Sequence, residues 1–173
     1  MNEIIKALKE RRSVRSFTDQ QVSPDDLNAV LEAGIYSSTG GGSQSTIFIA
    51  VQDAEAKAKI TQMNAAVMGK EGIDPYYGAP AIILVLADST KPTPVEDGSV
   101  ALANLHNAAY SLGLGACWIH RAKQMFESEE GKALLKEWGF EGDYIGVGAL
   151  ILGYAKGDLP NAAPRNSGRI KIV

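Results

Sequence analysis

The chain has 173 residues, of which 45% are hydrophobic and 21% charged, and its formal net charge is −3. This length corresponds to about one domain, and the composition excludes a disordered tail, a collagen-like repeat and a coiled coil. The single cysteine excludes a disulfide framework and is typical of a reducing compartment. No signal-peptide pattern opens the sequence, and the longest apolar run, 79–87, is too short for a membrane span. We therefore expect a single domain over residues 1–173, located in the cytoplasm and away from membranes.

Basic residues concentrate at the two ends of the chain. Residues 1–17 hold five basic and two acidic residues, and residues 154–173 hold four basic residues and one acidic residue. The body between them holds 8 basic and 17 acidic residues. A sequence pI near 5.4 argues against a nucleic-acid partner. Two interpretations stay open: both ends are solvated, or they meet in space around a compact anion such as a phosphate.

The first half of the chain predicts two helices, then alternating strands and helices. Asn2 caps a first helix that ends near Arg12, and Ser23-Pro24-Asp25-Asp26 is a helix start that leads to about Tyr36. The segments that follow are a small-residue loop over 37–45, a buried strand over 46–51, a helix from 53 through 68, a loop over 69–80 and a second buried strand over 81–87.

The second half predicts a central helix, two strands and a polar tail. After a break at 91–94, a helix of low charge ends at Gly113. The segments that follow are a short strand over 116–119, an amphipathic helix over 124–138, a long apolar run over 144–154, a polar tail over 155–168 and an alternating, edge-like strand over 169–173. We expect a three-layer α+β sandwich, a small mixed sheet flanked by about five helices. The last strand has no obvious sheet edge to join, so residues 155–173 form an arm that reaches over a partner subunit.

Common catalytic motifs do not account for the sequence. His106, His120 and Cys117 include no second ligand pair for a tetrahedral metal site, so we expect none. Cys117 lies in an apolar stretch where a thiol is usually inert, and no G-x-S-x-G motif occurs. The triple glycine of 40–43 lacks the Lys and Ser/Thr of a P-loop. It is either a flexible loop or a backbone that lies close to a ligand.

The most informative segment is Arg11-Arg12-Ser13-Val14-Arg15-Ser16-Phe17, where a helix ends and three guanidinium groups and a hydroxyl follow within five residues. Guanidinium groups match phosphate oxygens in pairs, and a serine adds a neutral donor. In an extended chain, alternate side chains project to one side, which would align Arg11, Ser13 and Arg15. A solvated basic cluster explains the same residues equally well.

Further motifs follow this segment in order along nearly the whole chain. They are the Ser-Pro-Asp-Asp-Leu helix start, the Ser/Thr/Gly loop ending in Ser43-Gln44, Tyr76-Tyr77-Gly78-Ala79-Pro80, the Leu112–Ile119 stretch, Gly146–Gly153 with Tyr154, and Pro164-Arg165. None is specific alone, but together they resemble the short members of the FMN-dependent nitroreductase family. The resemblance implies an α+β fold and an intertwined homodimer with two FMN sites at its interface.

The resemblance also assigns roles to the basic residues at both ends. Arg11 and Arg165 would hold the FMN phosphate, and Arg12 and Ser13 would line the phosphate and the ribityl chain. Arg15 would reach the pyrimidine edge of the flavin, where a cation stabilises the negative charge that develops on reduction.

Other residues would contact the isoalloxazine ring. Those from the loop of the other subunit are Ser38, Thr39, Gly40 and Gly42. Asn64 is a candidate for a hydrogen bond to the ring, and backbone amides near Ile119, His120 and Arg121 would face flavin N5.

On this resemblance no side chain acts as a catalyst, because the flavin carries the chemistry. NADH or NADPH would give a hydride to N5, and a small-molecule electron acceptor, a nitroaromatic or a quinone, would then receive the electrons in a ping-pong reaction. Three alternatives stay open. The protein is a family relative with an NAD(P)H-independent redox reaction, a non-catalytic flavin-binding protein, or a structural dimer with an anion site and no flavin.

The chain departs from the family pattern at four places. Gly42 replaces a common Asn, and Ser45-Thr46 replaces a common Pro-Trp. Ala163 stands where a Lys often precedes the phosphate-binding Arg, and His120-Arg121 replaces small or acidic residues. The cationic pair near N5 would favour an anionic substrate or would occlude the ring.

Overall fold

The computed structural model describes residues 2–173. Its elements, in chain order, are α1 (Glu3–Glu10), α2 (Pro24–Ile35), the short 3-10 helix η1 (Gly40–Gly42), β1 (Thr46–Val51), α3 (Ala54–Val67), β2 (Ala81–Asp88), α4 (Pro94–Ser111), β3 (Gly115–Ile119), α5 (Ala122–Glu127), α6 (Glu129–Glu137) and β4 (Tyr144–Gly153). The predicted helix caps are confirmed, since the side chains of Asn2, Ser23 and Asp53 each accept a hydrogen bond from a backbone N–H of the first turn.

The four strands form one sheet in the order β1-β2-β4-β3, and each neighbouring pair is antiparallel. The prediction of a mixed sheet is therefore wrong in strand direction. In residues 2–173 the only parallel pairing is an isolated bridge between Ser13 and Ala116. The reason lies in burial: β2 is buried on both faces from Ala81 through Ala87, and such a continuous apolar run is equally typical of a parallel strand.

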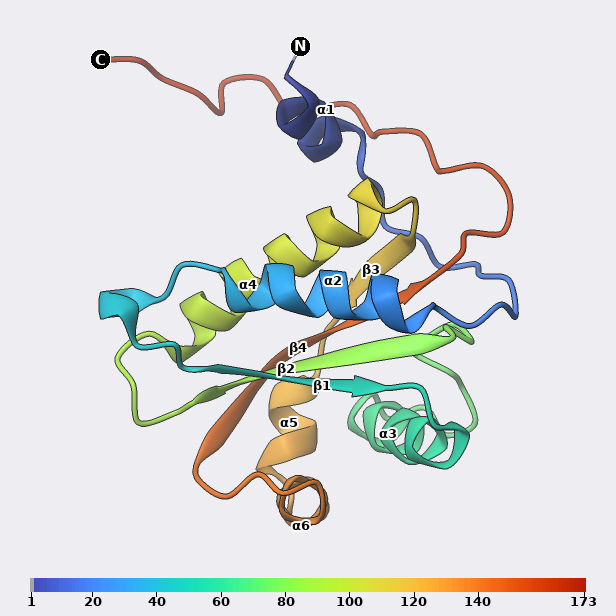
Figure 1. The fold of residues 1–173 in the computed structure, drawn as a ribbon, viewed down its shortest axis with the longest axis vertical. Coiled ribbons are helices and arrows are strands. Elements are labelled where there is room, and N and C mark those ends of the chain that lie inside the picture. The colour runs from blue at the N-terminus through green and yellow to red at the C-terminus, as the bar shows by residue number, and fades with distance from the viewer. Residues whose placement is uncertain (1) are drawn as a thin grey trace.

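Helices cover both faces of this sheet, which confirms the three-layer α+β class (Figure 1). The helices α2 and α4 lie on one face, and α3, α5 and α6 lie on the other. Each face has its own apolar core, because alternate residues of β2 point to opposite sides: Ile82 and Leu84 belong to one cluster, and Ile83 and Val85 to the other.

The predicted helix over 124–138 is wrong in continuity, because the structure has two helices there that meet at Ser128. This residue is extended, with φ −71° and ψ 155°, and its hydroxyl accepts a hydrogen bond from the Gly131 N–H at 3.0 Å. A Cβ at position 131 would collide with the backbone of Met125 and Phe126. The close approach of α6 to α5 therefore requires a glycine at its first turn.

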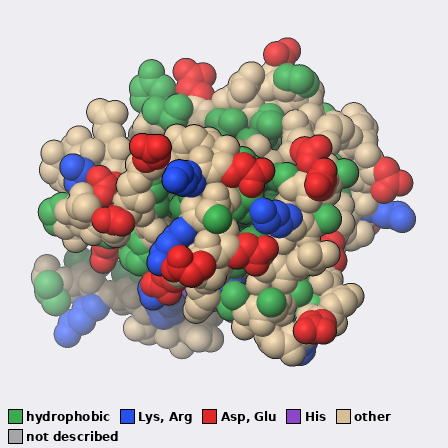
Figure 2. All heavy atoms as spheres, turned by 90° about the horizontal axis from the view of Figure 1, so that it is seen from below, with side chains coloured by type: hydrophobic (Ala, Val, Ile, Leu, Met, Phe, Trp, Pro, Cys, Tyr) green, Lys and Arg blue, Asp and Glu red, His purple; other side chains and the backbone are tan. Residues whose placement is uncertain are grey.

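The face formed by α3, α5 and α6 is an ordinary solvated surface. Acidic and basic side chains are interspersed across it (Figure 2). Several of them form exposed ion pairs, including Lys123 with Glu127 at 2.6 Å and Lys59 with Glu137 at 3.8 Å. Within residues 2–173, no helix combines the length and the apolar character that crossing a membrane requires.

The last nineteen residues, 155–173, extend away from the rest of the chain, and we call them the tail. Ala155 bridges to Phe17, and the Lys156 N–H donates to the Ser16 carbonyl at 3.0 Å. Beyond this point every side chain is exposed, and the predicted edge strand over 169–173 is wrong for the single chain. Ile170 is 88% exposed, and within residues 2–173 it pairs with no strand.

Helix α1 lies at the same end of the molecule as the tail (Figure 1). It is strongly amphipathic, yet none of its residues is buried. Ile4 is 70% exposed, and Ile5 and Leu8 are each more than half exposed. The apolar stripe of α1 is therefore left largely uncovered by the described residues of the chain.

Candidate functional site

The basic segment, residues 11–15, is fixed in an extended conformation beside β3. The Val14 N–H donates to the Ala116 carbonyl at 2.9 Å, and the buried Val14 side chain packs on Gly115, where no larger residue would fit. Because side chains alternate along an extended chain, Ser13 and Arg15 point away from the core that receives Val14. The segment therefore presents its polar side chains on the outer side of β3.

Arg11 is oriented by a buried histidine rather than by an acid. Its Nη1 lies 3.3 Å from Nδ1 and 3.1 Å from Nε2 of His106, which comes from α4. The His106 Nε2 is also 3.0 Å from the Ala116 carbonyl. A neutral imidazole that donates from Nε2 to this carbonyl leaves Nδ1 as the acceptor for Arg11.

Burial, and then the charge of Arg11, lower the pKa of His106 to about 4. His106 is therefore neutral at physiological pH and does not compensate the positive charge of Arg11. Among the described residues Arg11 forms no ion pair with a carboxylate. Its guanidinium group is held in place with its charge available to an anion.

Arg12 closes the end of α1. Its Nη1 donates to the carbonyl groups of Lys9 and Arg11, both at 2.8 Å, which are orphaned acceptors at a helix C-terminus. Its Nε is buried and has no hydrogen-bond partner among the described residues. Because buried polar groups are ordinarily hydrogen-bonded, this donor is free to bond to an acceptor on a bound ligand.

Four of the residues singled out from the sequence line one hollow of about 300 Å³, which we call the Arg121 hollow. They are Arg15, Ile119, His120 and Arg121. The rest of the lining is Met68, Ile73, Asp74, Pro75, Tyr77 and Trp118. The guanidinium carbon of Arg15 lies 6.0 Å from the centre of the Tyr77 ring, which is within cation–π range. The hollow thus combines two guanidinium groups with aromatic walls.

Asn64 is completely buried beneath this hollow. Its amide nitrogen donates to the Tyr76 hydroxyl and to the His120 carbonyl, both at 3.1 Å, and its oxygen accepts from the Arg121 Nε at 2.7 Å. Burial raises the pKa of Tyr76 to about 12, although the bond from Asn64 lowers it, so the phenol stays protonated. The amide group of Asn64 is fully engaged by the protein, and it fixes the 120–121 turn. Sequence reasoning noted Tyr76 only as part of a motif and missed this network.

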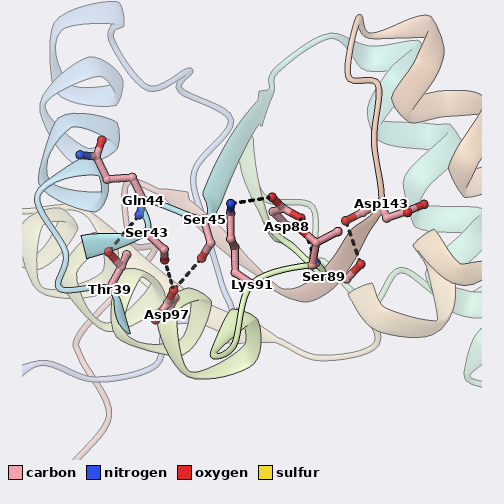
Figure 3. Close-up of polar contacts among 10 residues, drawn as sticks. Thr39, Ser43, Gln44, Ser45, Asp88, Ser89, Lys91, Asp97 and Asp143 are labelled. Atoms are coloured by element: carbon pink, nitrogen blue, oxygen red, sulfur yellow. Dashed lines mark hydrogen bonds and ion pairs between the residues drawn. The ribbon is translucent and has the colours of Figure 1, made fainter. Parts of the chain in front are cut away.

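The glycine loop, residues 38–42, is pinned to the start of α4 by one carboxylate (Figure 3). Asp97 accepts hydrogen bonds from the Gly40 N–H at 2.8 Å, Ser45 Oγ at 2.7 Å, Thr93 Oγ1 at 3.0 Å and Ser43 Oγ at 3.1 Å. Burial alone would raise the pKa of Asp97, but these hydrogen bonds outweigh it and lower the pKa. Sequence reasoning missed Asp97, because an acid near a helix start is ordinarily only a favourable charge.

Thr39 completes the inner side of this loop, since its hydroxyl accepts from the Gln44 N–H at 3.1 Å. Ser38 and Gly42 are exposed. The loop is thus rigid where it joins the sheet and open where it faces away from it.

The glycine loop and the basic segment lie at opposite ends of the sheet (Figure 1). The loop leads into Thr46, which pairs with Ala87, which in turn pairs with Ile145 at the start of β4. The basic segment lies beside the other end of β4, because Val14 is bonded to Ala116, which pairs with Leu152. One chain therefore does not bring Ser38, Thr39, Gly40 and Gly42 to the Arg121 hollow.

Arg165 is also separate from the other candidates. It is exposed in the tail, and none of its polar atoms contacts residues 2–173 within the hydrogen bonds or ion pairs observed. The structure thus gathers the basic segment, Asn64 and the 119–121 turn at one end, and leaves the glycine loop and Arg165 outside this group.

A larger hollow of about 740 Å³ lies between α6 and the start of β4. Its charged lining residues are mixed in sign: Glu127, Lys132, Lys136, Glu141 and Asp143. None of the residues singled out from the sequence lines it. This hollow lacks the excess of positive charge that an anionic ligand requires, so the candidate site is the smaller one.

Fold and site together define an α+β protein with arginines that lack a carboxylate partner, among the described residues, at one end of its sheet. The sequence profile of the nitroreductase family matches residues 8–154. The chain is 32% identical over 162 residues to an Archaeoglobus fulgidus protein provisionally named NADH dehydrogenase/NAD(P)H nitroreductase, covering 90% of this chain and 87% of that protein. It is 35% identical over 107 residues to an FMN reductase (NAD(P)H) of Bacillus subtilis, covering 62% of this chain and 38% of that protein.

Among solved structures, a nitroreductase with bound FMN from Bacteroides fragilis superposes with a TM-score of 0.92 at 30% identity, over 100% of both chains. The chain therefore belongs to the nitroreductase family.

Proposed function

We propose that the protein is an FMN-dependent NAD(P)H oxidoreductase that reduces nitroaromatics or quinones. The observation that carries this proposal is Arg11, whose uncompensated guanidinium group is fixed by a neutral histidine at the end of a basic segment that leads into the Arg121 hollow. Relatives named as an FMN reductase and as an FMN-bound nitroreductase support it. The single, buried and free Cys117 supports a reducing compartment such as the cytoplasm.

The residues present fit FMN. A phosphate requires cations and neutral donors, which Arg11 and Ser13 would supply from the same side of the extended segment. The Nε of Arg12, which lies between them in the sequence and has no partner among the described residues, is a further donor. The Arg121 hollow then offers aromatic and apolar walls, with Arg15 at its rim, for the flavin ring. At about 300 Å³ the hollow has the size of the smallest ligand pockets, as expected for half of a shared site.

The other half would come from a second copy of the chain. In a homodimer the glycine loop of the partner would lie along the ring, and the tail would bring Arg165 to the phosphate. The apolar stripe of α1 supports such a dimer, because Ile4, Ile5 and Leu8 are exposed on an otherwise folded subunit. The tail supports it as well, since the described part of the chain leaves residues 156–173 exposed.

The bound FMN would supply the redox chemistry, taking a hydride from NADH or NADPH and passing two electrons to the acceptor. The residues of the chain would bind the FMN, orient its ring and adjust its electrostatic surroundings. Arg11, Arg12 and Ser13 would anchor the phosphate. Arg15 would place a positive charge at the pyrimidine edge. Asn64 holds the 120–121 turn, and the backbone amides of this turn would face the ring.

The visible spectrum of the purified protein with added FMN, and then with NADH or NADPH without oxygen, tests this proposal. We expect oxidised-flavin bands that one or both nucleotides bleach. Bands that persist with both nucleotides would favour a flavin-binding protein with an NAD(P)H-independent reaction or with none. No bands after removal of excess FMN would overturn the assignment of the cofactor.

A further inference from the structure

Arg121 adopts a backbone conformation that a side chain disfavours. Its φ is +83°, in the left-handed region, where a non-glycine residue is strained. Asn64 stabilises this conformation from below, because it binds both the Arg121 Nε and the neighbouring His120 carbonyl. A buried amide therefore fixes the position of an arginine where a glycine would be unstrained. Strain that the surrounding structure maintains is typical of functional sites.

The Arg121 hollow keeps an excess of positive charge. Neither Arg15 nor Arg121 forms an ion pair with a carboxylate among residues 2–173. The only acid in the lining is Asp74, and both of its oxygens are already bound by backbone N–H groups, of Tyr76 at 2.8 Å and of Gly78. The terminal nitrogens of Arg121 have no partner among the hydrogen bonds of the described residues, because Asn64 binds only its Nε.

The walls of the hollow suit a planar aromatic group. Trp118 is 40% exposed and Tyr77 is 47% exposed, although both are large and partly apolar side chains. Ile73 and Met68 extend the same surface. In the proposed function the flavin ring would lie along these walls, and an acceptor would lie against the flavin with the terminal nitrogens of Arg121 at its edge. An acceptor that combines an aromatic ring with an anionic group would match both the flavin and the charge.

We propose that Arg121 is a specificity-determining residue that selects acceptors carrying a carboxylate on the aromatic ring. The proposal rests on the proposed function. For a nitrobenzoate, one NAD(P)H and one proton convert the nitro group to a nitroso group and release water. Arg121 binds the carboxylate through its terminal nitrogens and takes no part in this transfer of electrons.

The test compares 4-nitrobenzoate with its neutral counterpart 4-nitrobenzamide as acceptors for the holoprotein. We expect the wild type to favour the benzoate in kcat/KM. In Arg121→Gln the ratio of the two kcat/KM values falls about tenfold through the KM of the benzoate, the effect of one charge-assisted hydrogen bond in a partly exposed site. Lys123→Gln is the matched control, since it removes an equal charge two residues away, where Lys123 is paired with Glu127. This control leaves the ratio unchanged.

A second readout does not depend on turnover. Calorimetry of benzoate with the holoprotein gives a Kd that weakens about tenfold in Arg121→Gln and increases with salt, as expected for binding to one guanidinium group. Arg121→Gly removes the guanidinium group while suiting the left-handed backbone, so it reproduces the loss if Arg121→Gln folds poorly.

An acceptor ratio and a benzoate Kd that do not change in either variant would overturn the inference. So would a change in the KM of NADPH alone, because Arg121 would then bind the phosphate of the donor. The failure of the proposed function looks different: the wild type would not oxidise NADH or NADPH even with the neutral benzamide.

Discussion

At the scale of single residues, the site depends on charges that the subunit itself leaves uncompensated. Arg11 illustrates this, because a neutral histidine orients it and no carboxylate competes for it. An arginine paired with a carboxylate would have to give up that partner before it bound a phosphate. Because its partner is the neutral imidazole of His106 and not a carboxylate, the guanidinium group of Arg11 can bind an anion without first losing an ion pair.

Substitution of Arg11 measures this charge directly. We expect Arg11→Ala to weaken FMN binding by about 1.5–3 kcal/mol, which is the range for a hydrogen bond to a charged group. Fluorescence titration of FMN with the apoprotein gives the affinity. Lys9→Ala is the control, since it removes an equal charge from the exposed last turn of α1. An FMN affinity that is equal in the two variants would remove Arg11 from the phosphate site.

His106 makes the stability of the fold depend on pH. The unfolded residue binds a proton near pH 6.5, but the folded residue does so only near pH 4, because burial and Arg11 disfavour its charged form. As the pH falls through this window the unfolded state gains a proton that the native state does not bind. The free energy of unfolding is therefore fully retained above pH 6.5 and falls toward pH 4, by about 3 kcal/mol per subunit in total.

The variant His106→Gln lacks this titration. Urea unfolding at a fixed protein concentration, at pH 7 and at pH 5, should show a loss of stability on acidification that is about 2 kcal/mol larger for the wild type than for the variant. Glutamine keeps a donor that can reach the Ala116 carbonyl, so the comparison isolates the charge. Equal losses in the two proteins would show that His106 keeps an ordinary pKa in the fold.

At the scale of elements, one carboxylate joins the glycine loop to the start of α4. Asp97→Asn keeps the shape of the side chain but replaces one accepting oxygen with a donor. This donor faces either Gly40 N–H and the Thr93 hydroxyl, which share one oxygen, or the Ser43 and Ser45 hydroxyls, which share the other. We expect the loop to lose its fixed position and the FMN site of the partner subunit to weaken. Asp88→Asn is the control, because the contacts of Asp88 with Thr90 and Lys91 are local and exposed.

Mixed dimers decide whether the loop acts across the subunits. In a dimer of one Asp97→Asn chain and one Arg11→Ala chain, a loop that acts on its partner leaves one intact site. FMN titration of this mixed dimer should therefore show half the sites at the affinity of the wild type. Weak binding at every site would instead mean that the loop and the basic segment of the same chain form one site.

The elements that could be predicted from the sequence are those with local signals. Caps such as Ser23 and buried runs such as Ala81–Ala87 gave correct helices and strands, because hydrogen bonds of the first turn and burial on two faces leave direct patterns. The break at Ser128 was missed, since it depends on the close packing of Gly131 against α5. Asp97 and Asn64 were missed as organising residues, because their partners are distant in sequence and only the fold brings them together.

At the scale of the whole molecule, two surfaces are unexplained by the subunit alone. The tail is exposed from Lys156 onward, and the apolar stripe of α1 lies at the same end of the molecule (Figure 1). The tail contributes almost nothing to its own subunit, because its last backbone contact there is the bond from Lys156 to Ser16. Its alternating apolar residues, Ile170 and Ile172, would gain a partner only on a second chain.

Truncation after Gly157 tests whether the tail serves the dimer and not the fold of its own chain. The shortened chain keeps every buried residue of both cores, so far-ultraviolet circular dichroism should still show the α+β fold if the subunit is stable alone. Light scattering should show a monomer or an unstable protein, because the arm that would pack on the partner subunit has been removed. The protein should also lose its flavin, because Arg165 is removed with the arm. Full-length Arg165→Ala separates the two causes: it should weaken FMN binding while the protein stays a dimer. A truncated protein that remains a stable, yellow dimer would show that the tail does not hold the subunits together.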